Sequence, residues 1–320
     1  MTESDFLALL RALPLHPGAR GLRDDAAVVN GLVLTTDTLV EGVHFLARDP
    51  PGDVAWKLLA VNLSDLAAKG ATPEGVLLNY PLSDPDWDRA FLHGFDQALR
   101  EHACPLIGGD TVTLAPRSPR VLTLTALGRD AAAPPRTGAG AGDALWVTGT
   151  VGDGGAGLEL AKRAADDPAG LAIARGSAGP PELLAAYRRP VPRLVDGRAL
   201  ALHVHAMSDV SDGLLLDAAR MAEASGLAVT LDLAAVPLSP AYLAFRGEDR
   251  PARLAAATSG DDYQLLFAAS PDYLPPVPAA RIGAFAPGQG LTLHDRGEPL
   301  PLPASLGYEH TPLAPARGAP

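Results

Sequence analysis

Two short apolar runs flank an Asn30-Gly31 dipeptide near the N-terminus, and acidic residues lie at their outer ends. An Asn-Gly dipeptide between such runs is typical of a β-hairpin with a tight turn. Asp25 enters the first run and Asp37 leaves the second, so antiparallel pairing predicts that these two carboxylates are neighbours. Carboxylates that close together remain ionised only around a cation. The same stretch is equally compatible with a hairpin whose acidic end is solvated.

Hydrophobic periodicity predicts alternating helices and strands along the rest of the chain. We expect helices over residues 53–69, 87–102, 158–165, 194–203 and 214–225, and strands over residues 75–80, 106–111, 121–127, 144–149 and 228–232. The first of these helices, with Asp53 as its N-cap, is apolar almost all round and is therefore predicted to be buried. Asp65 within it needs a partner. An ion pair with Lys69 one turn later is one alternative, although such pairs are weak.

The N-terminus is acidic and has a short amphipathic pattern, in which Phe6, Leu9, Leu10 and Leu13 recur at helical spacing. It lacks the basic start and apolar core of a signal peptide. We therefore expect a short surface helix at this end of the chain.

A change of composition near the middle of the chain predicts two domains. The length of 320 residues also fits two domains better than one. Residues 131–142 are rich in Ala, Pro and Gly, so we predict a first domain over residues 1–135, a second over 136–310, and a disordered tail over 311–320. Residues 165–181, rich in Gly and Pro, are predicted to form a mobile loop.

A strand, a glycine-rich loop around Gly152 and Gly154, and a helix from Leu158 open the second half. This layout can cradle a phosphate with backbone N–H groups, although the Gly-Lys-Ser/Thr of a P-loop is missing. Arg136, in the predicted linker, is either solvated or paired with a phosphate.

The charge and the cysteine content narrow the classes of partner. The net charge of -11 argues against binding to nucleic acid or to an anionic membrane surface. No apolar run approaches the roughly 20 residues that span a bilayer. Cys104 is the only cysteine, so no intramolecular disulfide can form, which is compatible with a reducing cytoplasm. We therefore expect a cytoplasmic protein without nucleic-acid or membrane partners.

Six aspartates stand out because they lie at predicted loop edges or on the buried helix. They are Asp25, Asp37, Asp65, Asp110, Asp209 and Asp212, with Thr35, Thr36 and Ser211 beside them. Carboxylates and hydroxyls are hard oxygen ligands that suit magnesium. No His pair at helical spacing and no Ser-His-Asp set is apparent, so the pattern favours phosphoryl transfer without a covalent nucleophile.

Simpler explanations exist for several of these residues. Asp209 and Asp212 precede a predicted helix, where acids can cap the N-terminus and complement the helix dipole. The segment that ends in Gly109 and Asp110 is equally compatible with an ordinary turn. His44, a single histidine in a predicted loop, is more often structural than catalytic.

Several ordered motifs resemble those of the thiamine-monophosphate kinase family. They are Asp24-Asp25-Ala-Ala-Val, Thr36-Asp37-Thr-Leu-Val-Glu-Gly-Val-His44-Phe, Val61-Asn-Leu-Ser-Asp65-Leu-Ala-Ala-Lys-Gly, Ile107-Gly-Gly-Asp110-Thr, Trp146-Val-Thr-Gly-Thr-Val-Gly, Asp209-Val-Ser-Asp212-Gly and Ser259-Gly-Asp-Asp-Tyr. The similarity runs in order from about Gly21 to Tyr308, which is nearly the whole chain. The family belongs to the superfamily of aminoimidazole ribonucleotide synthetase.

The resemblance implies an α/β (α+β) fold of two domains and the transfer of the γ-phosphate of ATP to thiamine monophosphate, giving thiamine diphosphate. It also implies a homodimer, in which the N-terminal mixed sheets join into a β-barrel, and a C-terminal α/β sandwich. The magnesium (Mg2+) ligands that it implies are Asp25, Thr35, Thr36, Asp37, Asp65, Asp110, Asp209 and Asp212, of which Asp37, Asp65, Asp110 and Asp212 form the implied catalytic set. The implied nucleotide contacts are Gly109, Asp110, Arg136 and Ser211, and those on the thiamine side are His44, Asp261 and Tyr308.

Two departures from the family pattern leave alternatives open. Arg23 stands where the family usually has Gly before the paired acids, and Asp261 stands where it usually has Glu. One alternative is another enzyme of the superfamily that activates a carbonyl or amide oxygen with ATP. The other is a magnesium-nucleotide binding protein without catalytic activity.

Overall fold

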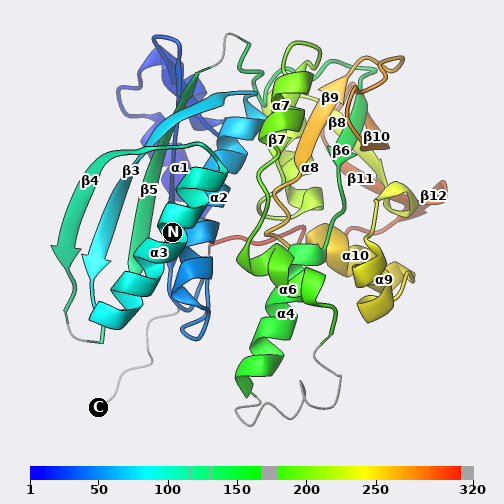
Figure 1. Cartoon of the computed structure of the whole chain (residues 1–320). Helices are drawn as coiled ribbons and strands as arrows, with labels where there is room; N and C mark the ends of the chain where they lie inside the picture. The colour runs from blue at the N-terminus through cyan, green and yellow to red at the C-terminus, as the bar shows by residue number, and fades with distance from the viewer. Residues whose placement is uncertain (116, 130–131, 167–178, 311–320) are drawn as a thin grey trace, which may run out of the picture.

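Two mixed β-sheets, one in each half of the chain, organise the structure (Figure 1). The computed structural model describes residues 1–115, 117–129, 132–166 and 179–310. Most of the predicted mobile loop at 165–181 and the whole predicted tail at 311–320 lie outside these described residues.

The N-terminal half contains a five-stranded sheet with the order β1-β2-β5-β3-β4. Its elements are α1 (Glu3–Arg11), a 3-10 helix (Pro17–Leu22), β1 (Ala27–Val29), β2 (Leu32–Val40), α2 (Pro51–Ala68), β3 (Thr72–Leu82), α3 (Pro85–Glu101), β4 (Leu106–Thr113) and β5 (Val121–Arg129). β3 and β4 are parallel, and the other neighbours are antiparallel. Burial alternates along β5, so one face of the sheet is packed and the other is open.

The predicted hairpin is confirmed. Val29 pairs with Leu32 and Val28 with Val33, and the two turn residues Asn30 and Gly31 both have positive φ angles, of 51° and 78°. A two-residue turn of this kind requires positive φ at both positions, which is why Asn-Gly is found there.

Helix α2 lies between the N-terminal sheet and the C-terminal half (Figure 1). Its buried residues extend around most of its surface, as the apolar sequence predicts, because one side packs on β2 and β5 and the other on the C-terminal half. The helix begins at Pro51 with Pro50 at the N-cap, so the prediction of Asp53 as N-cap is wrong. Asp53 instead pairs with Arg189 at 2.5 Å.

The C-terminal half contains a seven-stranded sheet with the order β12-β11-β8-β10-β6-β9-β7. Its elements are β6 (Ala144–Thr148), α4 (Asp153–Asp166), α6 (Pro181–Arg188), α7 (Leu194–Leu200), β7 (Ala206–Asp209), α8 (Leu214–Ser225), β8 (Ala228–Asp232), a 3-10 helix (Leu233–Ala235), α9 (Pro240–Arg246), α10 (Arg250–Thr258), β9 (Leu265–Ala269), β10 (Ala279–Ala286), β11 (Gly290–Asp295) and β12 (Glu298–Leu300). The helix predicted over 194–203 therefore ends earlier, at Leu200. α8 packs on this sheet, while α4, α9 and α10 share a smaller apolar cluster.

Helix α1 forms at the predicted place and begins with a capping box between Thr2 and Asp5. Its apolar side chains Phe6 and Leu9 remain 53% and 57% exposed. Amphipathic spacing therefore predicted the helix correctly, but burial of this face does not occur within one chain. Among the described residues, no helix is both long enough and apolar enough to cross a membrane.

Candidate active site

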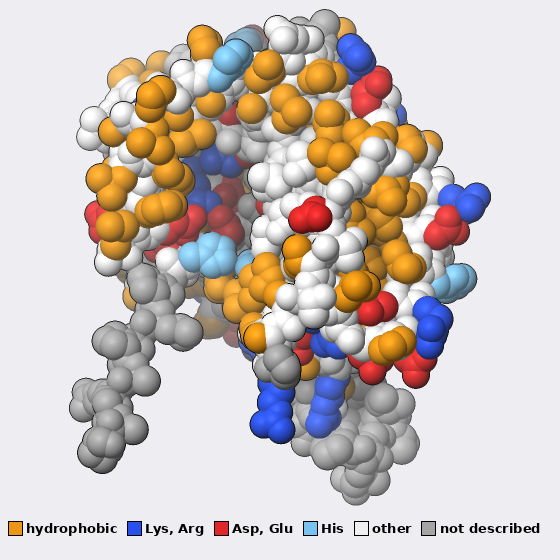
Figure 2. Space-filling view, turned by 90° about the vertical axis from the view of Figure 1, so that its left-hand side faces the viewer, with side chains coloured by type: hydrophobic (Ala, Val, Ile, Leu, Met, Phe, Trp, Pro, Cys, Tyr) orange, Lys and Arg blue, Asp and Glu red, His pale blue; other side chains and the backbone are white. Residues whose placement is uncertain are grey.

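A cavity of about 830 Å³ lies where the two halves of the chain meet. Figure 2 shows a hollow in the surface with acidic, basic and histidine side chains near it. Its walls come from β2 and α2 in the N-terminal half, and from the end of β7, the segment 258–263 and the segment 307–310 in the C-terminal half. Residues far apart in the sequence thus line one cavity.

Three carboxylates meet beside this cavity. Asp25 precedes β1, Asp65 lies on α2 and Asp209 ends β7, and one oxygen of each lies within 4.8 Å of the others. Burial, and then the nearby charge of Asp37, raise the pKa of Asp65 well above its usual value. Burial and the charge of Asp25 do the same to the pKa of Asp209. Three converging carboxylates, of which Asp65 and Asp209 resist ionisation, fit a hard divalent cation.

Asp37 and Asp212 extend this acidic group along the wall of the cavity. Burial, the charge of Asp212 and then that of Asp25 raise the pKa of Asp37 to about 6. The hairpin therefore brings Asp25 and Asp37 within electrostatic reach of each other, as its register predicts. Thr35 fixes the arrangement, because its hydroxyl donates to Asp65 Oδ2 and, at 3.3 Å, to the carbonyl oxygen of Asp25.

Basic side chains pair with Asp25 and Asp212 of the acidic group. Arg136 donates to one oxygen of Asp25, and Lys69 Nζ lies 2.9 Å from the other. Burial alone would raise the pKa of Asp25, but the charges of Arg136 and Lys69 lower it below the usual value. The simpler alternative for Asp65, an ion pair with Lys69, does not form, since the Lys69 ammonium pairs with Asp24 and Asp25 instead.

Gly109 and Asp110 do not join the other predicted site residues within this chain. Both lie on β4, whose residues are all exposed, and β3 and β5 separate that strand from β2. The carboxylate of Asp110 accepts a hydrogen bond from the adjacent N–H of Thr111 at 2.9 Å. The hydroxyl of Thr36 also points elsewhere, donating to the carbonyl of Leu124 at 3.1 Å.

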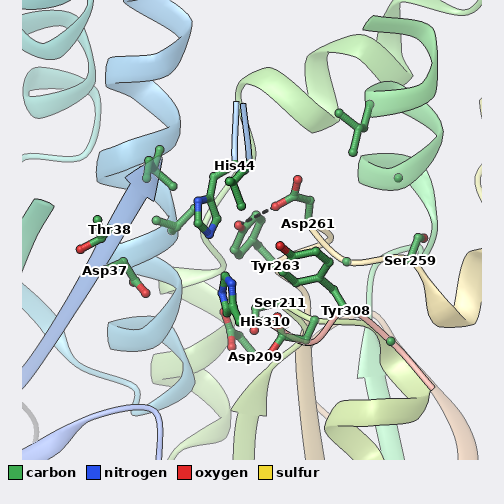
Figure 3. Close-up of a pocket in the computed structure, with 18 of the residues that line it drawn as sticks. Asp37, Thr38, His44, Asp209, Ser211, Ser259, Asp261, Tyr263, Tyr308 and His310 are labelled. Atoms are coloured by element: carbon green, nitrogen blue, oxygen red, sulfur yellow. Dashed lines mark hydrogen bonds between the residues drawn. The ribbon is translucent and has the colours of Figure 1, made fainter. Parts of the chain in front are cut away.

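The residues predicted on the thiamine side do line the cavity. Figure 3 shows His44 facing Asp261, Tyr308 and His310 across it. Asp261 accepts from the Tyr263 hydroxyl at 2.8 Å and from Lys57 Nζ at 2.8 Å. The rings of His44 and His310 are 5.4 Å apart.

Sequence reasoning missed several of the residues that shape the site. Lys57 and Lys69 could have been found, because a lysine in a helix that is otherwise apolar needs a buried acceptor. Tyr263 lies in a recognised motif but had no assigned role, and its pKa is raised by burial and by the charge of Asp261. His310, close to the C-terminus, carried no local signal.

The glycine-rich segment is not a phosphate cradle in this structure. α4 begins at Asp153, so Gly154 and Gly155 belong to its first turn and the prediction of a loop up to Leu158 is wrong. The N–H groups of Gly152 and Gly154 donate to the buried carboxylate of Asp262, at 2.8–2.9 Å and 3.3 Å. These donors are therefore used by the chain itself.

The capping explanation for Asp209 and Asp212 is also wrong. The N-cap of α8 is Gly213, without a side-chain hydrogen bond. Asp212 pairs with Arg220, and Asp209 accepts from the Ser64 hydroxyl at 2.6 Å. The backbone N–H of Ser211 donates to Asp217 rather than to Asp209 or Asp212, at 3.1 Å. Both aspartates are thus left at the cavity.

Comparisons with known proteins place this geometry in a wider group. Residues 23–129 match the family described as AIR synthase related protein, N-terminal domain, and residues 140–294 match the corresponding C-terminal domain family. The thiamine-monophosphate kinase of Caulobacter vibrioides is 38% identical and is matched over 97% of this chain and 91% of its own length.

Solved structures give the same result. The structure described as AaThiL complexed with AMPPCP and TMP has a TM-score of 0.81 and 28% identity, covering 97% of both chains. The thiamine-monophosphate kinase from Stenotrophomonas maltophilia K279a has a TM-score of 0.72 and 36% identity, covering 92% of this chain and 94% of that one.

Proposed function

This chain belongs to the thiamine-monophosphate kinase family, and we propose that the cavity between its two halves is the active site of that kinase. The enzyme is a phosphotransferase that moves the γ-phosphate of ATP to thiamine monophosphate and forms thiamine diphosphate. Support comes from the relatives that carry this name and from the similar structure complexed with AMPPCP, an ATP analogue, and TMP.

The charge of the cavity wall is the observation that carries the proposal. The acidic residues on it are Glu3, Asp37, Asp65, Asp209, Asp212 and Asp261. None of the described residues on this wall is a lysine or an arginine. Two phosphate-bearing substrates would be repelled by such a wall unless cations lay between them. The acidic wall also suits the positively charged thiazolium ring of thiamine.

We propose that magnesium ions provide this positive charge. The convergence of Asp25, Asp65 and Asp209 within 4.8 Å fits such an ion, and Asp37 and Asp212 would complete its surroundings. When bound, magnesium would neutralise the negative charge on the phosphate groups of both substrates, so that the two substrates could approach each other closely. Asp110 and the Thr36 hydroxyl remain predicted ligands for which this chain alone offers no such convergence.

The chain's own residues then mainly position groups. The acceptor is already a phosphate, so no strong general base is needed. Burial, and then the charge of His310, lower the pKa of His44, so this ring is neutral at pH 7 and can pack against a heterocycle without adding charge. Asp261 and Tyr308 line the same side of the cavity, from the segments 258–263 and 307–310.

ADP release tests the acceptor. We expect release that depends on thiamine monophosphate, with thiamine itself and small carboxylates or amides inactive as acceptors. Release that required a carbonyl or amide acceptor would favour the superfamily alternative. Tight binding of ATP without any turnover would favour a binding protein.

A homodimer is the second part of the proposal. All eight residues of β4 are exposed at the edge of the N-terminal sheet, including Leu106, Ile107 and Val112, which are 49–53% exposed. Strand β4 lies at the left-hand side of Figure 1. Figure 2, in which that side faces the viewer, shows many hydrophobic side chains. Long apolar edge strands pair with other chains. A second copy joined there would cover β4 and account for the position of Gly109 and Asp110 far from the acidic group.

The dimer is tested by the mass in solution. We expect wild type to have twice the monomer mass by light scattering. Ile107→Lys places a charge on the exposed strand and should shift the protein to the monomer. Leu274→Lys, at an 84% exposed position outside β4, is the matched control and should remain dimeric. A monomeric wild type would contradict the proposal.

We further place the reaction in the cytoplasm, without a nucleic-acid partner. The single cysteine, Cys104, is buried, and burial raises the pKa of its thiol to about 11, so it is a structural rather than a redox group. The net charge of -11 opposes binding to nucleic acid.

A further inference from the structure

Lys69 sits in a cage of oxygen atoms at the end of α2. Its side chain is 0% exposed. Its ammonium donates to Asp24 Oδ1 at 2.5 Å, to the carbonyl oxygen of Met207 at 2.8 Å and to that of Pro134 at 3.1 Å, and it lies 2.9 Å from Asp25 Oδ2. A buried ammonium is costly to desolvate unless such partners surround it.

The cage joins parts of the chain that are distant in sequence. Asp24 and Asp25 precede the hairpin, Pro134 lies in the segment that connects β5 to β6, and Met207 lies on β7. Lys69 itself is the C-cap of α2, where the helix dipole favours a positive charge. The Lys69 ammonium therefore connects both halves of the molecule next to Asp25, a member of the acidic group.

The acids of the site fall into two sets according to their basic neighbours. Asp24 is paired with Arg20 and Lys69, and Asp25 with Arg136 and Lys69. Among the described residues, no ion pair compensates Asp65 or Asp209, whose neighbours are the hydroxyls of Thr35 and Ser64. The chain thus neutralises one set with its own cations and leaves the other set without them.

We propose that Lys69 is a fixed internal cation that does for Asp24 and Asp25 what a small bound cation would otherwise do. Two carboxylates and two carbonyls surround the ammonium. Their oxygen atoms replace the hydration shell of a cation. Lys69 is therefore a positioning residue. It holds Asp25 in place beside Asp65 and Asp209, and it stabilises Asp24 and Asp25 as anions even when no diffusible ion is bound.

Chemical rescue of Lys69→Ala tests this inference. The substitution leaves room for a small amine, whereas Lys69→Met fills the same space without a charge. We expect the thermal midpoint of Lys69→Ala to fall by roughly 5–15 °C, because two buried carboxylates lose their shared cation. Ammonium or methylammonium chloride should recover at least half of that loss. Tetramethylammonium chloride at equal concentration, too large and without N–H donors, should not.

Three controls separate the inference from general salt effects. Lys69→Met should lose stability and show no preference for ammonium. Wild type and Lys162→Ala, which removes an exposed lysine on α4, should respond equally to all three salts. Lys69→Ala that is as stable as wild type, equally unstable in all three salts, or unfolded even in ammonium would overturn the inference.

A second measurement rests on the proposed function. Turnover of thiamine monophosphate by Lys69→Ala should fall at least tenfold and rise again with ammonium, in parallel with the thermal midpoint. If wild type does not use this substrate, the proposed function fails while the thermal result still decides the role of Lys69. If wild type is active but ammonium restores neither stability nor turnover, the inference about Lys69 alone is wrong.

Discussion

Aspartates of this site differ in chemistry because of their neighbours. Asp25 lies between Arg136 and Lys69, which hold its pKa low despite burial. Asp65 has a hydroxyl neighbour and other carboxylates, so burial and the charge of Asp37 raise its pKa. The same type of side chain is therefore easily ionised at Asp25 and costly to ionise at Asp65 unless a cation is bound.

Asp65→Asn tests the role of the uncompensated set. It removes a charge but little volume, so kcat should fall by at least about 100-fold, the upper range for losing a group that supports a metal site. The thermal midpoint without metal should stay equal or rise, because a neutral amide replaces a buried carboxyl group that is costly to ionise.

Asp96→Asn is the matched control for this variant. Asp96 is an exposed residue of α3 whose partner is Arg100, so its loss should leave kcat unchanged. Wild-type activity of Asp65→Asn would contradict the assignment of Asp65 to the magnesium site.

At this scale the sequence predicted that five of the six acids gather, but not that Asp110 lies apart from them, nor which cations compensate them. The spacing of the hairpin placed Asp25 beside Thr35 and near Asp37, because register follows from a two-residue turn. The partners of Lys69 come from three segments distant in sequence, so no local pattern indicates them.

Helix α2 links the two sides of the site. Lys57, Asp65 and Lys69 are spaced by multiples of four residues along it, and so they lie along one side. Lys57 reaches Asp261, Asp65 joins the acidic group, and Lys69 holds the hairpin acids. The all-round apolar pattern predicted a buried helix, but the polar contacts depend on which elements pack against it.

The ion pair between Lys57 and Asp261 should govern the binding of thiamine monophosphate. Asp261 has a φ of 68°, and its carboxylate is held by Lys57 and the Tyr263 hydroxyl. Asp261→Ala and Lys57→Met should each raise the KM for thiamine monophosphate about tenfold while changing the KM for ATP little. Because the two side chains act together, the double variant should raise the KM for thiamine monophosphate by about as much as either single variant does.

Steady-state kinetics of the three variants checks this prediction. Additive effects would show that the two residues act independently. An unchanged KM for thiamine monophosphate in Asp261→Ala would remove Asp261 from the substrate side. Equal increases in both KM values would point to general damage to the cavity.

Over the whole molecule, the site lies where the two halves of the chain meet, and burial there raises the pKa values of Asp37, Asp65 and Asp209. Burial and neighbouring carboxylates raise the pKa of Asp37 from 3.8 to about 6. The stability that this protonated group contributes is present below pH 3.8 and is lost as the pH rises through about 6. A bound divalent cation favours the ionised form instead.

Magnesium binding should therefore release protons, and more of them at pH 6 than at pH 8, where Asp37 is already ionised. Titration calorimetry in buffers of different ionisation enthalpy measures this number. Asp37→Asn should release fewer protons than wild type at pH 6. Equal release by wild type at the two pH values would contradict the raised pKa of Asp37.

The order of motifs along nearly the whole chain made the family and the two-sheet fold predictable. The exposed surfaces were less visible in the sequence. The exposure of β4 and of the apolar side of α1 depends on how the elements pack in three dimensions, and the separation of Asp110 from the other acids depends on strand order. Strand order is set by packing between distant segments, which local periodicity does not encode.

Transfer of label from ATP labelled at the γ-phosphate tests the central claim most directly. The purified protein is incubated with labelled ATP, magnesium and thiamine monophosphate, and the products are separated by chromatography. We predict labelled thiamine diphosphate in equal amount to ADP, none with thiamine as acceptor, and none when the magnesium is chelated. Label found only in free inorganic phosphate, or no label transfer in the presence of magnesium, would contradict direct phosphoryl transfer to thiamine monophosphate.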